Sequence, residues 1–213
     1  MNVFAEYIQL PNGQEFRKKT LLQFGNSTKL IGSAILINPG SSNPINEIGE
    51  HFNTIQSFYL ENHEISILES ELCNWRIFNI DSTMRFVAKV FNGGYVGDET
   101  NLEGIIQLFN CSYYKEQNLA LARNNLVNYA EYNFKEHSLL SNAPVYFGWG
   151  NEGKEGSISE IAKDIFSSYD LTSTPIYSQE FFENPFYHPM YINRSYKSNI
   201  KTQKLLTDFY ALF

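Results

Sequence analysis

The hydrophobic pattern near the start of the chain contains two runs rich in leucine and isoleucine, at 16–25 and 30–37. A short Gly-Asn-Ser segment separates them, so we expect the two runs to pair as a hairpin. The second run ends in consecutive apolar residues, 34–37, and stops at Asn38 before a Pro-Gly pair. An apolar run without polar alternation is typical of a strand covered on both faces. The residues after Ile37 are therefore expected in a loop.

Further along, apolar residues recur every three or four positions, as they do on one face of a helix. The first such helix is expected to open at Asp81 or Ser82, which are good caps, and to end at the glycine pair 93–94. Ser157 and Glu160 have the spacing of a capping box at the start of a later helix. The remaining helical stripes cover these segments: 119–134, 158–169 and 200–212.

Short apolar runs between the helices predict strands. They lie at 105–109, 145–149 and 176–177. A long aromatic loop is expected over 178–195, whereas the pattern of 41–80 defines nothing beyond a strand or short helix around 65–72. The alternation of strands and helices predicts one α/β domain over 1–213, a three-layer sandwich with a parallel-rich central sheet. In such sheets ligands bind beyond the carboxyl ends of the strands.

The composition is that of a globular protein, with 43% hydrophobic and 18% charged residues and a high aromatic fraction of 15%. Residues 1–7 lack the basic start and apolar run of a signal peptide, and no apolar run is long enough to span a bilayer. Cys73 and Cys111 fit neither a disulfide framework nor a zinc site. We therefore expect a cytoplasmic protein that does not enter membranes.

A net charge of −7 argues against a protein that coats nucleic acid indiscriminately, because Lys and Arg contacts to phosphate drive that binding. A local basic cluster is nevertheless present near the end of the chain, at Arg194, Lys197, Lys201 and Lys204. Intervals of three and four would align these side chains on one side of a helix. The cluster is either a solvated helix face or a surface that contacts the phosphates of a nucleic acid.

A glycine motif follows the predicted strand at 145–149, where Gly148, Gly150 and Gly153 match the GxGxxG pattern. Glu152 and Glu155 would repel a pyrophosphate at the start of the next helix, which favours an ordinary glycine-rich turn over dinucleotide binding. The four histidines show no metal-ligand spacing with acids or thiols, so neither a metal nor a cofactor is expected.

Two side chains stand out as candidates for chemistry. His188 precedes Pro189 in the loop after the last predicted strand, where a stiff backbone either holds the imidazole toward a pocket or leaves it on the surface. Asn38 ends a buried strand, and its amide either orients a water for attack or merely turns the chain. The residues alone leave both choices open.

Several motifs resemble known families. The segment 37–40 reads I-N-P-G and is similar to the GINPG segment of the mismatch-specific uracil and thymine DNA glycosylases. His188 and Pro189 stand where the uracil-DNA glycosylase superfamily has its second motif, HPSPLS or NPSGLS, although Met190 and Tyr191 depart from it. Residues that resemble the next helix of that family are Arg85, Phe86, Val90, Gly94 and Tyr95.

A second resemblance covers more of the chain. A bacterial and phage domain family of unknown function carries LNPS, D-P-T-I-R, N-L-F, WG and HPLY motifs in that order. The corresponding segments here are 37–40, 81–85, 108–110, 149–150 and 188–191. As a set, these short matches imply a uracil-DNA glycosylase-like fold more strongly than they imply an enzyme.

The resemblance implies an N-glycosidase that excises a base from DNA or from a nucleotide, with Asn38 positioning the attacking water and His188 stabilising negative charge on the departing base. The flipped base would stack on an aromatic ring. The rings that could serve are Phe52, Phe58, Tyr113, Phe186 and Tyr187. The substrate-binding residues implied by the motifs are Ile37, Pro39, Gly40, Ser41, Asp81, Arg85, Asn110, Pro189 and Tyr191.

The long insert over 41–80 replaces the part that selects uracil in these enzymes. The resemblance thus favours a modified or non-standard base, and a role in defence against phage DNA is one interpretation. The main alternative is a non-catalytic module that binds a nucleotide or modified base in the same pocket. A third possibility is an interaction protein whose aromatic loops dock a partner.

Overall fold

A computed structural model describes residues 1–116, 118, 121, 139–140, 143–169 and 175–213. Within these residues a single mixed sheet has the strand order β4–β5–β1–β2–β6–β3–β7. Its strands are β1 (Asn2–Gln9), β2 (Glu15–Phe24), β3 (Leu30–Leu36), β4 (Pro44–Glu47), β5 (Trp75–Phe78), β6 (Gly104–Asn110) and β7 (Val145–Phe147). The helix expected over 119–134 falls almost entirely outside the described residues.

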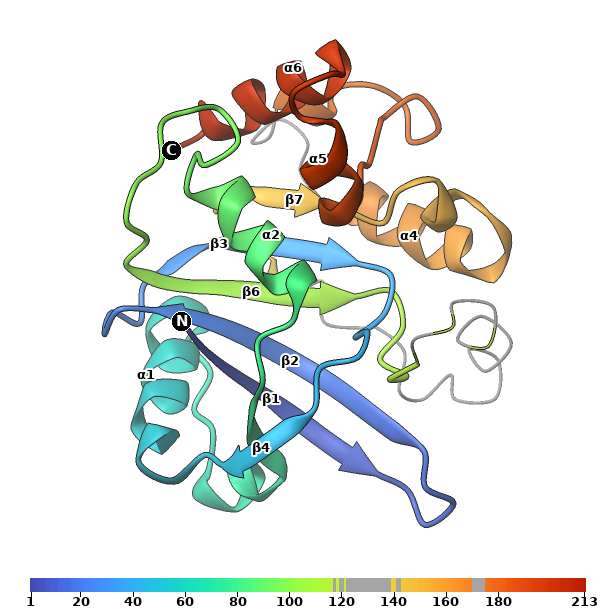
Figure 1. Cartoon of the computed structure of the whole chain (residues 1–213). Helices are drawn as coiled ribbons and strands as arrows, with labels where there is room; N and C mark the ends of the chain where they lie inside the picture. Colours follow the sequence, from blue (N-terminus) through green and yellow to red (C-terminus); the bar gives the residue numbers. More distant parts are fainter. Residues whose placement is uncertain (117, 119–120, 122–138, 141–142, 170–174) are drawn as a thin grey trace.

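The predicted α/β class is confirmed, but the sheet is not parallel-rich. Strand β3 pairs in parallel with β6 and with β7, whereas the other four pairings are antiparallel. Figure 1 shows β6, β3 and β7 as arrows that point the same way. The antiparallel half begins with β1, for which no strand was predicted.

The expected hairpin between 16–25 and 30–37 is also wrong, because β6 lies between β2 and β3. Two strand spacings measure about 10 Å, a distance that a five-residue connection spans easily. The sequence of a short turn therefore does not distinguish adjacent strands from strands one place apart. The real hairpin joins β1 to β2, where the backbone N–H of Leu10 donates to the carbonyl of Gln14 at 2.8 Å.

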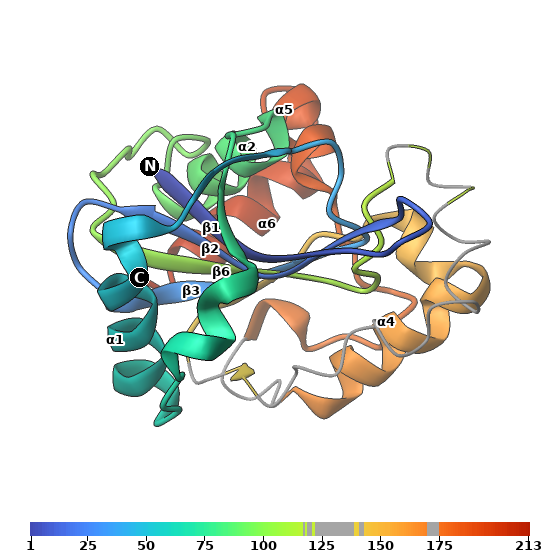
Figure 2. The same ribbon diagram turned by 90° about the horizontal axis from the view of Figure 1, so that it is seen from below.

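Helices cover both faces of the sheet. Figure 2 shows α2, α5 and α6 on one face and α1 and α4 on the other. Their bounds are α1 (Phe52–His63), α2 (Ser82–Phe91), α4 (Gly156–Ser168), α5 (Pro189–Ser195) and α6 (Ile200–Tyr210). Short 3₁₀ turns are η1 (Gly49–His51), η2 (Glu69–Asn74), η5 (Asn151–Lys154) and η7 (Pro175–Tyr177).

Three elements of the prediction change in detail. The segment 41–80, which the pattern left undefined, contains β4, α1, η2 and β5. The strand expected at 176–177 is instead η7, whose buried Tyr177 hydroxyl accepts a hydrogen bond from the backbone N–H of Phe147 at 3.1 Å. The helix expected from the Ser157–Glu160 spacing begins at Gly156, with Glu155 at the cap position.

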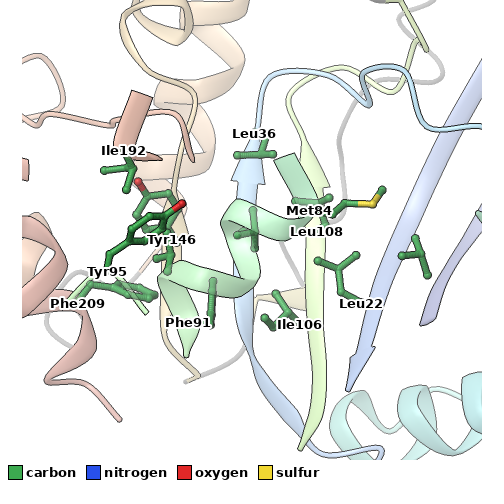
Figure 3. Packing of buried hydrophobic residues seen from close by; sticks show 14 of the residues in the cluster. Leu22, Leu36, Met84, Phe91, Tyr95, Ile106, Leu108, Tyr146, Ile192 and Phe209 are labelled. Carbon is green, nitrogen blue, oxygen red and sulfur yellow. The ribbon is translucent and has the colours of Figure 1, made fainter. Parts of the chain in front are cut away.

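The core between the sheet and α2, α5 and α6 is apolar and tightly interlocked (Figure 3). Helix α2 buries Met84, Val87, Val90 and Phe91 against β3 and β6, whereas the predicted stripe had Ala88, which is only partly buried, in place of Val90. The Phe91 ring meets that of Phe209 on α6 edge-on at 5.2 Å. Burial of these side chains is what holds α2 and α6 against the sheet.

The opposite face carries an aromatic core beneath α4. Phe147 on β7 packs against Trp149, Phe166 and Phe186, with ring centroids 4.9–5.9 Å apart. The pairs with Phe166 and Phe186 are edge-to-face, a geometry that adds stability beyond the area the rings bury. Both cysteines are free; Cys111 is buried and Cys73 is exposed. No helix in the described part of the chain has the length and apolar character needed to cross a membrane.

We expect Leu206→Ala to lower the free energy of unfolding by about 2–5 kcal/mol, because the Leu206 side chain on α6 is almost completely buried against α2 and the sheet. Chemical denaturation measures this change. Lys201→Ala, on the exposed side of the same helix, is the matched control and should cost less than about 0.5 kcal/mol. Equal effects would show that α6 does not pack as described.

Candidate functional site

The loop after β3 borders a pocket of about 310 Å³ at the carboxyl ends of β3 and β6, which we call the polar pocket. Its floor is formed by residues of the sheet: Arg17, Leu36, Leu108 and Asn110. Its walls come from the loop after β3, the start of α2 and the start of α5: Asn38, Pro39, Gly40, Ser41, Asp81, Ser82, Thr83, Met84, His188 and Met190.

A second pocket of about 670 Å³ adjoins the first and shares Asn38, His188 and Met190 with it. We call it the aromatic pocket. Its other lining residues are Ile37, Trp149, Gly150, Asn151, Glu152, Tyr187 and Tyr191. The rings of Tyr187 and Tyr191 stack with centroids 4.9 Å apart. A ligand that spans both pockets would thus pass between Asn38 and His188.

Asn38 is held by its side-chain nitrogen, which donates to the backbone carbonyl of Glu116. That carbonyl belongs to the segment after β6. The segment is joined to the loop after β3 by a hydrogen bond from the N–H of Ser112 to the carbonyl of Ile37 at 2.8 Å. No described residue donates to the Asn38 side-chain oxygen. The free atom of the amide is therefore an acceptor, as needed to bind a water or a ligand donor.

His188 caps α5, and its Nδ1 accepts a hydrogen bond from the backbone N–H of Met190 at 3.2 Å. Burial lowers the pKa of His188 to about 4, and the charge of Asp81 opposes that shift only in part. The imidazole is therefore neutral at pH 7. With Nδ1 engaged as an acceptor, the ring proton is on Nε2, which makes Nε2 a hydrogen-bond donor for a ligand.

The glycine-rich segment after β7 supports the His188 loop. A side chain at Gly148 would lie 2.8 Å from Leu36 and 3.2 Å from Pro189, so glycine permits β3, β7 and α5 to approach closely. Gly150 donates its N–H to the carbonyl of Phe186. Lys154 donates to the carbonyls of Phe182 and Asn184 at 2.9 and 2.5 Å. The GxGxxG match is thus part of a turn that packs against the loop before α5.

Asp81 is the N-cap of α2, and its Oδ1 accepts from the N–H of Met84 at 2.8 Å. Its carboxylate therefore has a structural task, predicted from the sequence, and also lines the polar pocket. A negative charge at a helix N-terminus is stabilised by the helix dipole.

Two buried polar side chains complete the floor of the polar pocket. Arg17 on β2 is 1% exposed, and Asn110 at the end of β6 is equally buried. The guanidinium donates from Nη2 to the carbonyl of Pro39, but its Nε and Nη1 have no hydrogen-bond partner among the described residues. The same is true of both amide atoms of Asn110. Arg17 was not predicted, because its position in an alternating strand gives no sign that it lies under the Asn38 loop.

The structure brings together most of the predicted site residues. Asn38, Pro39, Gly40, Ser41, Asp81, Asn110 and His188 line the polar pocket, and Ile37 and Tyr191 line the aromatic pocket. Arg85 is exposed on α2 and lines neither pocket. Pro189 is buried at the first position of α5, where its fixed φ suits the start of a helix.

Among the predicted stacking rings, only Tyr187 lines a pocket described above. Phe58, Tyr113 and Phe186 are buried in the cores, and Phe52 packs on the face covered by α1. These aromatic residues stabilise the fold, which is the more frequent role of an aromatic in an apolar run.

The basic cluster does not form one helix face. Arg194 lies on α5, Lys197 follows it, and Lys201 and Lys204 lie on α6, because the chain turns between the two helices. Lys204 pairs with Asp208 at 2.7 Å. All four side chains are exposed. Their proposed contact with nucleic acid remains a prediction.

The described residues contain no group of three or more His, Cys, Asp and Glu side chains placed to hold a metal ion. Comparison with known proteins found no matching family model, no significantly similar curated protein and no significantly similar solved structure. The fold and the site thus define the chain as a mixed α/β protein with a polar pocket at the carboxyl ends of parallel strands. The motif resemblance to the DNA glycosylases stays a prediction.

We expect His188 to make the folded state less stable in acid. Its pKa is about 4 when folded and about 6.5 when unfolded, so the unfolded chain binds the proton more readily. The free energy of unfolding should fall as the pH drops from 6.5 to 4, with a contribution from His188 of up to about 3 kcal/mol. His188→Asn keeps a capping acceptor without this titration. Denaturant melts should show a shallower decline for this variant, and identical slopes would contradict the burial of His188.

Proposed function

We propose that the chain is an N-glycosidase that acts on a nucleotide or on a base in DNA. The observation that carries this proposal is the placement of Asn38 and His188, which are far apart in sequence but line the same two adjoining pockets. An acceptor oxygen and a neutral donor that line one cavity suit a reaction that adds water to one end of a bond and releases an anion at the other.

In the proposed reaction a water oxygen bonds to the anomeric carbon of the sugar while the bond from that carbon to the base nitrogen breaks. The electron pair leaves with the base. The free oxygen of Asn38 accepts a hydrogen bond from the water and directs its lone pair to the carbon. The proton that the water loses passes to the Asp81 carboxylate, which lines the same pocket, or to solvent.

His188 acts on the departing base in this proposal. Because its imidazole is neutral, it donates a hydrogen bond from Nε2 to the base oxygen on which negative charge develops. The cap on α5 orients the ring before the ligand arrives, so little reorganisation is needed. The stacked pair of Tyr187 and Tyr191 offers ring surface to the base in the aromatic pocket.

The helices on both faces of the sheet agree with the uracil-DNA glycosylase-like sandwich that the motifs imply, and we keep that fold as part of the proposal. A modified base as the substrate, phage DNA as its source and a cytoplasmic location remain proposals that rest on the sequence alone.

The test is release of free base from a panel of nucleotides and of oligonucleotides with modified bases, followed by mass spectrometry. Asn38→Ala and His188→Ala should each lower the rate by about 100-fold or more while the fold is retained, because each removes a preorganised hydrogen bond of the transition state. Asn53→Ala and His51→Ala, on the side of α1, are the matched controls and should keep the full rate.

Binding without base release from any substrate would contradict catalysis and favour the non-catalytic binding module. Activity that survives both Asn38→Ala and His188→Ala would show that the reaction takes place elsewhere on the chain.

A further inference from the structure

Arg17 carries a buried charge that the fold does not fully compensate. Desolvation lowers the pKa of its guanidinium to about 10, so the group is still positive at pH 7. Its Nη2 donates to the carbonyl of Pro39, and the ring of Phe78 lies 5.5 Å away. Nε and Nη1 are buried and make no hydrogen bond with any residue that the structure describes. A buried charge with unpaired donors destabilises a fold in general, and such a group is a candidate to bind a ligand that supplies the missing partner.

The negative charge of Asp81 raises the pKa of Arg17 through space, but the two side chains do not form an ion pair. Its Oδ1 is already the acceptor that caps α2. Asp81 therefore accepts no hydrogen bond from Nε or Nη1 of Arg17.

Asn110 adds a second set of unpaired groups beside Arg17. The backbone N–H of Arg17 donates to the carbonyl of Tyr113 at 3.0 Å, which places the segment after Asn110 alongside β2. Both side chains line the polar pocket, and both are about 99% buried. Together they present Nε–H, Nη1–H and an amide N–H₂ at the floor of one cavity, a donor set that suits an oxyanion.

The aromatic pocket provides the other half of a binding site. It adjoins the polar pocket at Asn38 and His188, and it holds the stacked rings of Tyr187 and Tyr191. A base in the aromatic pocket and an anionic group on the floor of the polar pocket would leave the sugar between Asn38 and His188.

We infer that Arg17 and Asn110 form an oxyanion subsite that holds the phosphate of a free nucleoside monophosphate. This inference rests on the proposed function and names its substrate class as a mononucleotide rather than DNA. The phosphate of a mononucleotide ends the molecule and so suits a buried floor, whereas a phosphodiester in a strand is joined to a further nucleoside that would also have to enter the cavity. A net charge of −7 is also more compatible with a small anion held by one buried cation than with a duplex.

The experiment is calorimetric titration of the full chain with uridine 5′-monophosphate and with uridine, repeated with adenosine 5′-monophosphate and adenosine. The monophosphates should bind about tenfold or more tightly than the nucleosides, because a hydrogen bond to a charged group is strong in a buried site. Asn110→Asp, nearly isosteric but negative, and Arg17→Met should each abolish this preference.

Lys201→Met and Lys204→Met test whether the phosphate is instead bound by the exposed cations of α6, and they should leave the preference intact. Circular dichroism checks folding, and Asn110→Asp decides the question if Arg17→Met does not fold. Equal affinity for nucleotide and nucleoside would overturn the inference, and so would loss of the preference only in the lysine variants. Uracil-6-carboxylate tests whether the subsite takes a carboxylate instead. If it binds and the monophosphates do not, the inference is also wrong.

The two proposals fail in different ways. Tight binding of the monophosphates without base release would refute the glycosidase and leave the subsite in place. Base release from oligonucleotides only, with no preference for mononucleotides, would refute the subsite and leave the glycosidase.

Discussion

The placement of β3 between β6 and β7, with both neighbours parallel to it, is the constraint on which the site depends. Because β6 and β7 run in the same direction as β3, the loops that follow all three strands emerge at one edge of the sheet. The loop after β3 provides Asn38, the end of β6 provides Asn110, and the turn after β7 supports the loop that ends at His188. Residues spread over more than half of the chain thereby converge.

The antiparallel half of the sheet contributes the buried positive charge of Arg17 to the polar pocket. Arg17 lies near the start of β2, and because β2 runs antiparallel to β6, that start lies at the carboxyl end of β6, where the pocket is. The polar floor opposes stability, since desolvated groups without partners weaken a fold. The apolar clusters on both faces of the sheet offset this cost. Such a division between stabilising core and costly floor is typical of binding sites.

The sequence predicted individual helices and strands better than it predicted which strands pair with each other. Helix α2 could be predicted because its Asp81 cap and its apolar stripe are both encoded within eleven residues. The position of β6 between β2 and β3 could not, since strand order depends on pairing between distant segments. In the same way Asn38 and His188 could be selected from their local context, whereas Arg17 acquires its meaning only when the Pro39 carbonyl folds over it.

The hydrogen bond between the Arg17 guanidinium and the carbonyl of Pro39 ties the floor of the polar pocket to the loop that bears Asn38. A ligand that accepts hydrogen bonds from the same guanidinium also restrains the Asn38 loop. An ordered loop in turn raises the affinity for that ligand. By thermodynamic reciprocity the two effects are equal in size. An occupant of the floor and the order of the Asn38 loop are therefore coupled through this one hydrogen bond, and the coupling requires no rearrangement of the sheet.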